Sequence, residues 1–363
     1  MKIKSLKLKN YRNYDILNLD FDEAANIFYG DNAQGKTNIL EAVYLTGTTK
    51  SHRGAKDREM IRFGSDEAHL ETIVEKNGID YQIDMHLKKT GSKGIAINKI
   101  PIKRASELFG IVNLVFFSPE DLNVIKNGPS ERRRFIDMEL SQLDKVYMNN
   151  LSNYNKIVNQ RNHLLKEISF GDRASLESTL DVWDMQLVQY GNKIIERRTE
   201  FIQEMNEIIA SIHKKLTGDR EDIKVIYEPH NGSMDLEDAL KKNRDRDLRL
   251  KSTSTGPHRD DICFMTGDLD IRKYGSQGQQ RTAALSLKLS EIEMVKRSIH
   301  DTPVLLLDDV LSELDKHRQN YLLDSIHDIQ TLITCTGVDE FVNHRFSINK
   351  VFHVRNGQVI REN

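Results

Sequence analysis

The sequence predicts an α/β fold in which a mixed β-sheet is interrupted by an inserted helical lobe. A glycine-rich loop at residues 30–37 stands between a short apolar run and a helical pattern. A second apolar run, at 304–307, ends in two aspartates. Between these two sites, apolar residues repeat at heptad spacing over residues 176–212. Strand patterns near both ends of the chain therefore bracket a helical middle.

Composition and charge narrow the class of protein. The chain has 363 residues, enough for one to three domains, and 38% of them are apolar, which is enough to build a core. Six prolines and 30% charged residues fit long solvent-exposed helices and exclude collagen-like, disulfide-stapled and proline-rich disordered chains. The net charge of −2 shows no overall field of a nucleic-acid binder, although a local basic face would suffice for one.

The sequence shows no membrane or export signal. No apolar run approaches the roughly 18 residues of a membrane span, and the first residues alternate in polarity rather than form a signal segment. Cys263 and Cys335 match no metal or redox spacing, and the 12 histidines include neither an i,i+4 pair nor a cluster with cysteine. We therefore expect a cytoplasmic protein with reduced thiols and no membrane partner, and the sequence offers little support for a metalloenzyme.

Strand patterns dominate the first part of the chain. Residues 3–8 place apolar side chains among lysines, which predicts an edge strand protected by charge. Asn77-Gly78 is a typical hairpin turn between two of the antiparallel strands that follow. The remaining predicted strands of this part are residues 25–29, 68–75, 81–87, 95–98 and 111–117.

The helical middle reads as an antiparallel hairpin. Its second helix carries the stripe over residues 176–212, its first a rougher stripe over 143–165, and residues 170–172 break the two. We interpret the stripes as core packing between two helices rather than a ligand site. Gly191 inside the second helix is unfavourable by about 1 kcal/mol relative to alanine, and the sequence supplies no reason for it. After Tyr227 the chain is polar and charged through Leu250, and no element is predicted there.

Strand patterns return in the last part of the chain, at residues 262–265, 304–307, 332–335, 351–354 and 358–360. Asn356-Gly357 again marks a hairpin. We therefore expect one domain formed by residues 1–118 with 252–363, and an inserted helical lobe at 119–251.

The loop at residues 30–37 fits G-x-x-x-x-G-K-[ST] at every fixed position. Glycines let several backbone N–H groups point at one anion, and the following helix adds its positive end. Lys36 is expected to reach the β- and γ-phosphates and to act in catalysis, and the Thr37 hydroxyl to ligate Mg²⁺. A chance match is the weaker interpretation, because a strand and a helix flank the loop. The predicted nucleotide-binding residues of the loop are Gly30, Asp31, Asn32, Ala33, Gln34, Gly35, Lys36 and Thr37.

A phosphate loop of this type needs a carboxylate on a neighbouring strand. The apolar run before Asp308 predicts a strand buried on both faces, with the carboxylates at its carboxyl end. Asp308 is expected to hold Mg²⁺ through water, and Asp309 to orient or deprotonate the attacking water. The long separation from Lys36 fits the helical insertion.

Two further polar segments lie near the acidic strand. Ser276 and Gly278 precede a helical pattern and suit contact with a terminal phosphate; the alternative is an ordinary helix N-cap. The segment after Asp309 is able to reach across an interface, with simple helix capping as its alternative. The residues assigned are Ser276, Gln277, Gly278 and Gln279 to the anion segment, and Ser312 and Asp315 to the second.

These pieces, in this order, resemble ABC-type ATPases of the branch that includes SMC and Rad50 proteins. The pieces are the phosphate loop (30–37), the helical lobe, a signature loop (276–279), the acidic strand (304–309) and a D-loop (312–315). The closer resemblance, over nearly the whole chain, is to the RecF family of bacterial recombination mediators. The stretches that carry it are residues 11–14, 30–37, 51–53, 117–122, 128–137, 255–261, 276–279, 308–309 and 312–315, of which Gly256-Pro257-His258-Arg259-Asp260 and Arg133-Arg134-Phe135-Ile136-Asp137 are the more specific.

The resemblance implies ATP and Mg²⁺ as cofactors, with Arg12 and Asn13 also at the nucleotide. It implies a head-to-tail dimer in which ATP on one copy is capped by residues 276–279, the signature segment, of the other copy. It further implies binding of duplex DNA, including double-strand/single-strand junctions, and RecR, RecO and, indirectly, RecA as partners.

Three departures from the wider ABC pattern suggest slow hydrolysis suited to a switch. Asp309 stands where many relatives have glutamate, and residues 118–120 occupy the Q-loop place without a glutamine. Thr334-Cys335-Thr336 replaces a histidine, so either threonine is a candidate γ-phosphate sensor.

The candidate DNA contacts are basic residues in three segments: Lys50, Arg53, Lys56 and Arg58 after the phosphate-loop helix, Lys88, Lys89 and Lys93 near the strand turns, and Arg132, Arg133 and Arg134 in the densest basic run. For that run, a solvated helix start is the slightly preferred alternative. Two other function classes stay open: the ABC subunit of a membrane transporter, and a structural SMC-like clamp without regulated hydrolysis.

Overall fold

The computed structural model describes residues 1–168, 173–337 and 348–362. The chain forms two compact units: unit 1 is Met1–Asp121 with Glu291–Asn363, and unit 2 is Leu122–Ser290. The first boundary is close to the expected 118/119. The second falls after residue 290 rather than 251, because the small sheet and the start of a long helix pack with the helical lobe; Ser286 on that helix, for example, hydrogen-bonds His213 at 2.9 Å.

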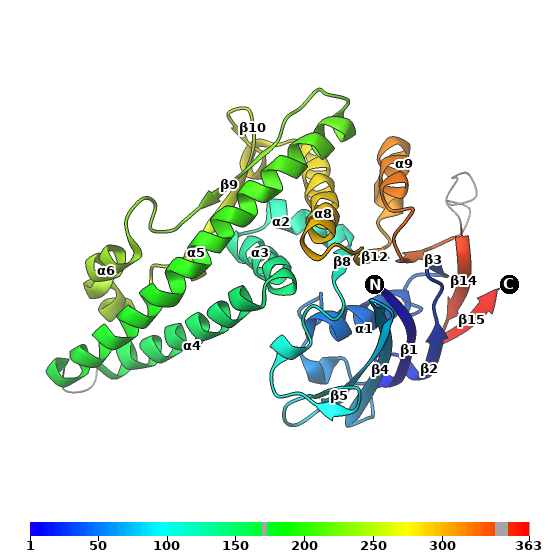
Figure 1. The fold of residues 1–363 in the computed structure, drawn as a ribbon, viewed down its shortest axis with the longest axis horizontal. Coiled ribbons are helices and arrows are strands. Elements are labelled where there is room, and N and C mark those ends of the chain that lie inside the picture. The colour runs from blue at the N-terminus through cyan, green and yellow to red at the C-terminus, as the bar shows by residue number, and fades with distance from the viewer. Residues whose placement is uncertain (169–172, 338–347, 363) are drawn as a thin grey trace. The chain divides into compact units, whose positions relative to one another are not determined.

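Unit 1 contains two sheets and their covering helices (Figure 1). Its elements are β1 (Lys2–Tyr11), β2 (Tyr14–Asp20), β3 (Ala25–Tyr29), α1 (Lys36–Thr48), β4 (Glu67–Lys76), β5 (Ile79–Lys88), β6 (Gly94–Ile97), β7 (Ile100–Pro101), β8 (Leu114–Phe117), β12 (Val304–Asp308), α9 (Lys316–Ser325), β13 (Thr331–Cys335), β14 (Ile348–Arg355) and β15 (Gln358–Glu362).

Unit 2 holds most of the helices, and one helix continues from it into unit 1. Its elements are α2 (Leu122–Lys126), α3 (Pro129–Leu143), α4 (Lys145–Ile168), α5 (Arg173–Thr217), β9 (Lys224–Glu228), α6 (Leu236–Leu250), β10 (Asp261–Thr266), β11 (Leu269–Asp270), α7 (Ile271–Tyr274) and the first part of α8 (Gln277–Ile299).

The first sheet of unit 1 has the order β2-β1-β4-β5-β6-β7 with antiparallel neighbours. The prediction that the first strand is an edge strand is wrong, because β1 pairs with β2 on one side and β4 on the other. Its lysines make cross-strand ion pairs instead, as Lys7 does with Glu71 at 2.7 Å. The predicted hairpin is confirmed: Asn77 and Gly78 both have positive φ, as a type I′ turn requires.

The second sheet of unit 1 carries the phosphate loop. Its order is β15-β14-β3-β13-β12-β8; all neighbours are parallel except β14 and β15. β12 and β13 are buried along their whole length, as expected of parallel strands covered on both faces. Because β3, β13 and β12 are neighbours and parallel, their carboxyl ends meet at one edge. One buried core joins both sheets and α1, with members such as Leu8, Leu40 and Leu306.

The predicted helical hairpin is confirmed in unit 2, where α4 and α5 pack along each other (Figure 1). Most described residues of both stripes are buried, among them Tyr154, Leu187 and Ile194, whereas others such as Trp183 and Tyr190 are half-buried. The predicted break at residues 170–172 lies outside the described residues. Gly191 now has a reason: a Cβ there would come within 2.5 Å of Leu236 and 3.3 Å of the Tyr154 ring.

The helix α6 was not predicted, because its segment offers few apolar residues. Asp235 caps its first turn by accepting the N–H of Glu237, and Leu236, Ala239 and Leu240 are buried. Most of the other residues of the helix are charged, so its apolar residues are too few to mark a helix by periodicity. Within the part of the chain described, no helix is both long enough and apolar enough to cross a membrane.

Candidate functional site

The phosphate loop connects β3 to α1 at the carboxyl edge of the parallel sheet. Two of its glycines have φ values that favour glycine, +148° at Gly30 and +116° at Gly35. A side chain at Gly30 would collide with the backbone of Val354 on β14. The loop ends as α1 begins at Lys36, and the first N–H groups of a helix have no partner within the helix. The backbone therefore offers several donors and a positive helix end to an anion.

Lys36 is folded back across its own loop. Its ammonium donates to the carbonyls of Gly30 at 2.7 Å and Asp31 at 3.0 Å, and its side chain is only 4% exposed. A phosphate oxygen is a stronger acceptor for an ammonium than a carbonyl is. The geometry thus holds the charge of Lys36 at the loop in the absence of any phosphate contact.

Thr37 and Asp308 lie together although they are far apart in the sequence. The Thr37 hydroxyl donates to Asp308 Oδ1 at 2.7 Å, and the Thr334 hydroxyl donates to the same oxygen at 2.8 Å. Burial raises the pKa of Asp308 above its ordinary value, although these two hydrogen bonds act in the opposite direction. A threonine hydroxyl and a carboxylate are oxygen donors of the kind that Mg²⁺ prefers, so this pair fits the predicted metal ligands.

The structure separates the two candidate phosphate sensors. The Thr334 side chain is buried, donates to Asp308 and accepts the N–H of Asp309 at 3.0 Å, so its role is to position the two carboxylates. Thr336 is exposed. The geometry therefore does not favour Thr334 as a direct phosphate contact.

Asp309 stands just beyond the end of β12 in an unusual backbone conformation. Its φ is +51°, in the left-handed region that residues other than glycine seldom adopt. The contact of its N–H with Thr334 holds it there. Residues held in such conformations concentrate at functional sites, which agrees with a water-orienting role.

Arg12, predicted to lie at the nucleotide, is engaged with a buried carboxylate. Its guanidinium binds Glu41 on α1 through two hydrogen bonds of 2.7 Å, and Tyr11 and Ser51 donate to the same carboxylate. Burial raises the pKa of Glu41, but the contacts with Arg12 and Ser51 outweigh it and hold the pKa below its ordinary value. Glu41 belongs to none of the sequence motifs; the available signal was a single glutamate on the apolar helix after the phosphate loop.

Asn13 contacts the phosphate loop itself. Its side-chain amide donates to the carbonyl of Gln34 at 2.9 Å and accepts from Asn38 at 2.9 Å. On the other side, the hairpin between β14 and β15 reaches the same loop, because the Asn356 N–H donates to the side chain of Gln34 at 2.7 Å. Two turns from distant parts of the chain therefore support the loop.

The signature segment lies in unit 2 at the start of α8. Ser276 and Gln279 form a reciprocal capping box: the Ser276 N–H donates to Gln279 Oε1 at 2.9 Å, and the Gln279 N–H donates to Ser276 Oγ at 3.2 Å. The capping alternative is thus present in the structure. It does not exclude anion contact, because Ser276, Gln277 and Gly278 are exposed.

The segment after Asp309 caps a helix. Asp315 accepts the N–H of Arg318 at 3.0 Å at the start of α9, and Ser312 donates to the carbonyl of Asp309 at 2.8 Å. Both side chains are exposed, so they remain accessible to another molecule.

The candidate DNA residues differ in their exposure to solvent. Lys50, Arg53, Lys56 and Arg58 are exposed in the segment after α1. Arg132 is 4% exposed and bonded to Asp261 at 2.5 and 3.0 Å, which contradicts both DNA contact and the solvated helix start at this residue.

Arg133 is half-buried and donates to the Asp260 carbonyl at 2.8 Å. The Arg-Arg-Phe-Ile-Asp and Gly-Pro-His-Arg-Asp stretches thus meet in a polar network inside unit 2. Arg198 on α5, which belongs to none of the sequence motifs, lies at its centre, with Asp137 at 2.8 Å and Asp260 at 3.2 Å.

Comparison with known proteins supports this architecture. Residues 2–359 match the family described as RecF/RecN/SMC N terminal domain. The DNA replication and repair protein RecF of Agathobacter rectalis is 66% identical over 359 residues, which is 99% of each chain. A solved structure of the recombination mediator protein RecF with ATP, described within the RecFOR pathway, is 34% identical, with a TM-score of 0.92 over 100% of this chain and 98% of that one.

A more distant match shows the fold alone. The Smc head domain of Pyrococcus furiosus is 15% identical, with a TM-score of 0.58 over 99% of this chain and 96% of that chain. The fold is therefore the ABC-type ATPase head that SMC proteins share. With this fold and these full-length matches, the chain belongs to the RecF family of DNA replication and repair proteins.

Proposed function

We propose that this chain is an ATP-dependent DNA-binding protein of recombinational repair, which works in the cytoplasm as an ATP-driven dimer with slow hydrolysis as its switch. The observation that carries the proposal is the convergence of Thr37, Asp308 and Thr334 behind the phosphate loop. It brings together the two oxygen ligands that a Mg²⁺–triphosphate needs. A relative that is 34% identical is described with ATP, which supports the same ligand here.

In this proposal the loop at residues 30–37 binds the phosphates through its backbone N–H groups. Lys36 exchanges its two loop carbonyls for the β- and γ-phosphates, and Thr37 and Asp308 hold Mg²⁺. When bound, Mg²⁺ neutralises charge on the phosphates. Asp309 then orients the attacking water, and Asn13 keeps the loop in its binding conformation.

The dimer forms through the signature segment of a second copy. Ser276 is exposed at the start of a long helix, and a Cβ at Gly278 would meet only the Ser276 hydroxyl, at 3.8 Å. An open helix start with a free approach suits the terminal phosphate of ATP held by a partner. Ser312 and Asp315, both exposed, are placed by the proposal at the same interface.

The dimer binds duplex DNA, and the exposed basic residues of unit 1 supply the phosphate contacts. Arg132 is left out of this surface because its guanidinium is committed to Asp261. By family membership we place the DNA substrate at double-strand/single-strand junctions and take RecR, RecO and, indirectly, RecA as partners. Asp309, one methylene shorter than glutamate, supports slow turnover; a turnover rate of hundreds per second would exclude the switch.

Ser276→Arg tests the dimer. The larger arginine side chain blocks access of the partner's ATP to the start of α8, so we expect ATP-driven dimerisation to be lost. ATP binding by the monomer stays, because the phosphate loop is unchanged. Light scattering with and without ATP measures the state, and Ser233→Arg, another exposed serine of unit 2, is the matched control. A fully dimeric Ser276→Arg protein would refute the in-trans contact.

DNA binding is tested on duplex, gapped and single-stranded substrates with and without ATP. Each phosphate contact contributes about 0.9 to the slope of log affinity against log salt. Replacing Arg53 and Lys56 together by alanine is expected to reduce that slope by about two, whereas Arg132→Met leaves it unchanged in protein that stays folded. A flat salt response of the unmodified protein would exclude the phosphate contacts.

A further inference from the structure

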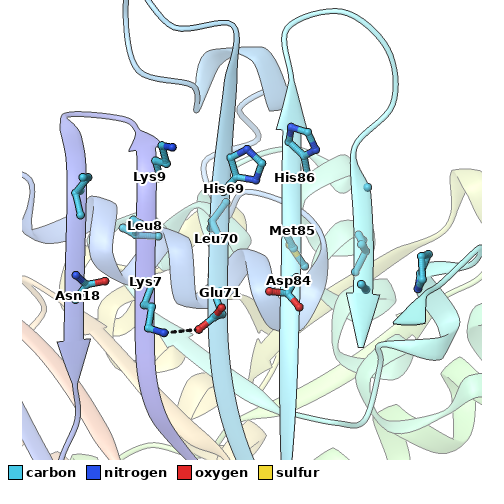
Figure 2. A pocket seen from close by; sticks show the side chains of 15 residues that line it. Lys7, Leu8, Lys9, Asn18, His69, Leu70, Glu71, Asp84, Met85 and His86 are labelled. Carbon is cyan, nitrogen blue, oxygen red and sulfur yellow. Dashed lines mark hydrogen bonds and ion pairs between the residues drawn. The ribbon is translucent and has the colours of Figure 1, made fainter. Parts of the chain in front are cut away.

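Two histidines that are 17 positions apart in the sequence lie side by side on the solvent face of the first sheet. His69 on β4 and His86 on β5 are direct cross-strand partners in the antiparallel register. Figure 2 shows them as neighbours at one end of the hollow that these strands line. Side chains that face each other across antiparallel strands have Cβ atoms roughly 4.5–5.5 Å apart. The sheet therefore brings together two imidazoles that no short motif connects.

A carboxylate completes the group. Glu67 is two residues before His69 on the same strand, so both side chains point to the same face. One of its oxygens lies 2.8 Å from His86 Nε2, and the other lies 3.6 Å from His69 Nε2. The three nearest ligand atoms all lie within 4.8 Å of one another.

These distances are close to those of a metal site. A tetrahedral ion with bonds of about 2.0–2.1 Å to its ligands holds them roughly 3.3 Å apart. The two rings are stacked with centroids 4.1 Å apart and an interplanar angle of 21°, and the Nε2 atom of each ring lies near the Glu67 carboxylate. The exposed His69 and Glu67 side chains would rotate to bring all three atoms to one ion.

The donor set selects the class of ion. Two imidazoles and one carboxylate suit Zn²⁺, Cu²⁺ or Ni²⁺, whereas Mg²⁺ prefers oxygen ligands and keeps its waters. The Glu67 carboxylate supplies a negative charge beside the two rings, since a glutamate side chain is ionised at neutral pH. Lys9, the partner of His69 on β1, is the nearest opposing charge in the register, and it weakens the site without occupying a ligand position.

We propose that Glu67, His69 and His86 form a binding site for a divalent transition metal of the Zn²⁺ class. The ion joins β4 to β5 across their register, with one coordination position left open to solvent. The side chains are 53%, 46% and 32% exposed respectively, so an ion reaches the site directly. None of the three belongs to the phosphate loop or to the acidic strand, and the site is therefore separate from that of Mg²⁺–ATP.

The test uses the full-length protein without nucleotide or Mg²⁺. Co²⁺ serves as a spectroscopic probe, because its visible d–d bands report nitrogen and oxygen ligands in tetrahedral geometry, and Zn²⁺ is then titrated to displace it. We expect the bands in the unmodified protein and in His327→Ala, which removes an exposed histidine elsewhere in unit 1. His86→Ala and Glu67→Gln are expected to weaken Zn²⁺ binding at least about tenfold, as losses of metal contacts do.

Thermal unfolding provides a second readout that does not depend on colour. Zn²⁺ raises the melting temperature of the unmodified protein, since it binds only the folded sheet, and it does not raise that of His69→Ala/His86→Ala. The isosteric Glu67→Gln keeps the test valid if a histidine variant fails to fold. Equal Zn²⁺ affinity of the unmodified protein and these variants, or no Co²⁺ bands in the unmodified protein, would overturn the proposal.

Discussion

Replacing Arg198 by methionine tests whether the buried ion network of unit 2 holds the helical lobe together. The side chain of Arg198 is 1% exposed and donates to the Pro257 carbonyl at 2.7 Å and to Asp137 at 2.8 Å. It also donates to Asp260 at 3.2 Å and to the Tyr147 hydroxyl at 3.0 Å. Methionine fills much of the same volume but removes the charge and every one of these donors.

The expected loss of unfolding free energy follows from the carboxylates that stay in the network without their arginine. Removing one member of a buried ion pair destabilises by about 3–5 kcal/mol, because the other charge stays buried without its partner. Asp260 is 1% exposed and remains so, whereas Asp137 is 27% exposed and is able to regain water. We therefore expect the lower end of the range, about 3 kcal/mol.

Arg197 is the matched control, one residue earlier on the same helix. It is 23% exposed and pairs with Glu200 at 3.3 Å and Glu204 at 3.0 Å, both of which are about half exposed. Such surface pairs contribute about 0–1 kcal/mol. Arg197→Met is therefore expected to change the free energy of unfolding by less than about 1 kcal/mol.

Urea unfolding followed by the fluorescence of Trp183 measures both variants. Trp183 is the only tryptophan of the chain, and it packs against the cluster around Leu165 in unit 2, so its signal reports this unit. With a slope of about 1–3 kcal/mol per molar urea, Arg198→Met lowers the midpoint by about 1 M or more. Equal effects of the two methionine variants, or a change below about 1 kcal/mol for Arg198→Met, would refute the reasoning.

Three further predictions concern unit 1. Glu41→Gln destabilises the protein by about 2 kcal/mol at pH 7. Because Arg12 holds the pKa of Glu41 low, the stabilisation by the Glu41 carboxylate is present above about pH 4.5 and is lost as pH falls through the folded-state pKa. The difference in unfolding free energy between variant and unmodified protein, measured by urea unfolding, therefore disappears in acid. Thr334→Val removes one hydrogen bond to Asp308 and weakens Mg²⁺-dependent ATP binding about tenfold by fluorescence titration, with nucleotide affinity in EDTA unchanged. Gly30→Ala abolishes ATP binding in the same titration, since a side chain collides with backbone; measurable binding would show that the loop shifts.

Local patterns were sufficient wherever neighbouring residues set the structure. The glycines of residues 30–37, the apolar run before Asp308 and the heptad stripe of α5 each specify their own backbone. Asn77-Gly78 and Asn356-Gly357 formed the expected turns, because positive φ at both positions of such a turn is a property of the dipeptide.

Contacts between residues that are distant along the chain account for the features that the sequence did not predict. Whether β1 is an edge or an interior strand depends on which strands pair with it, and its own alternation is compatible with both. Arg132 looks like a surface cation in the sequence, and only Asp261, brought close by the fold, shows that it is buried. Gly191 was unexplained until Leu236 and Tyr154 were seen to pack against it.

The sequence by itself determined the phosphate loop, the acidic strand, the helical hairpin and the family, because the patterns that indicate each of them lie in short stretches of consecutive residues. Only the tertiary structure showed that the Thr334 hydroxyl donates to Asp308, and that His69 meets His86 with Glu67 beside them. The physical reason is the same in both cases. Partners that are distant along the chain are set by strand order and register, and register is a property of the folded sheet as a whole.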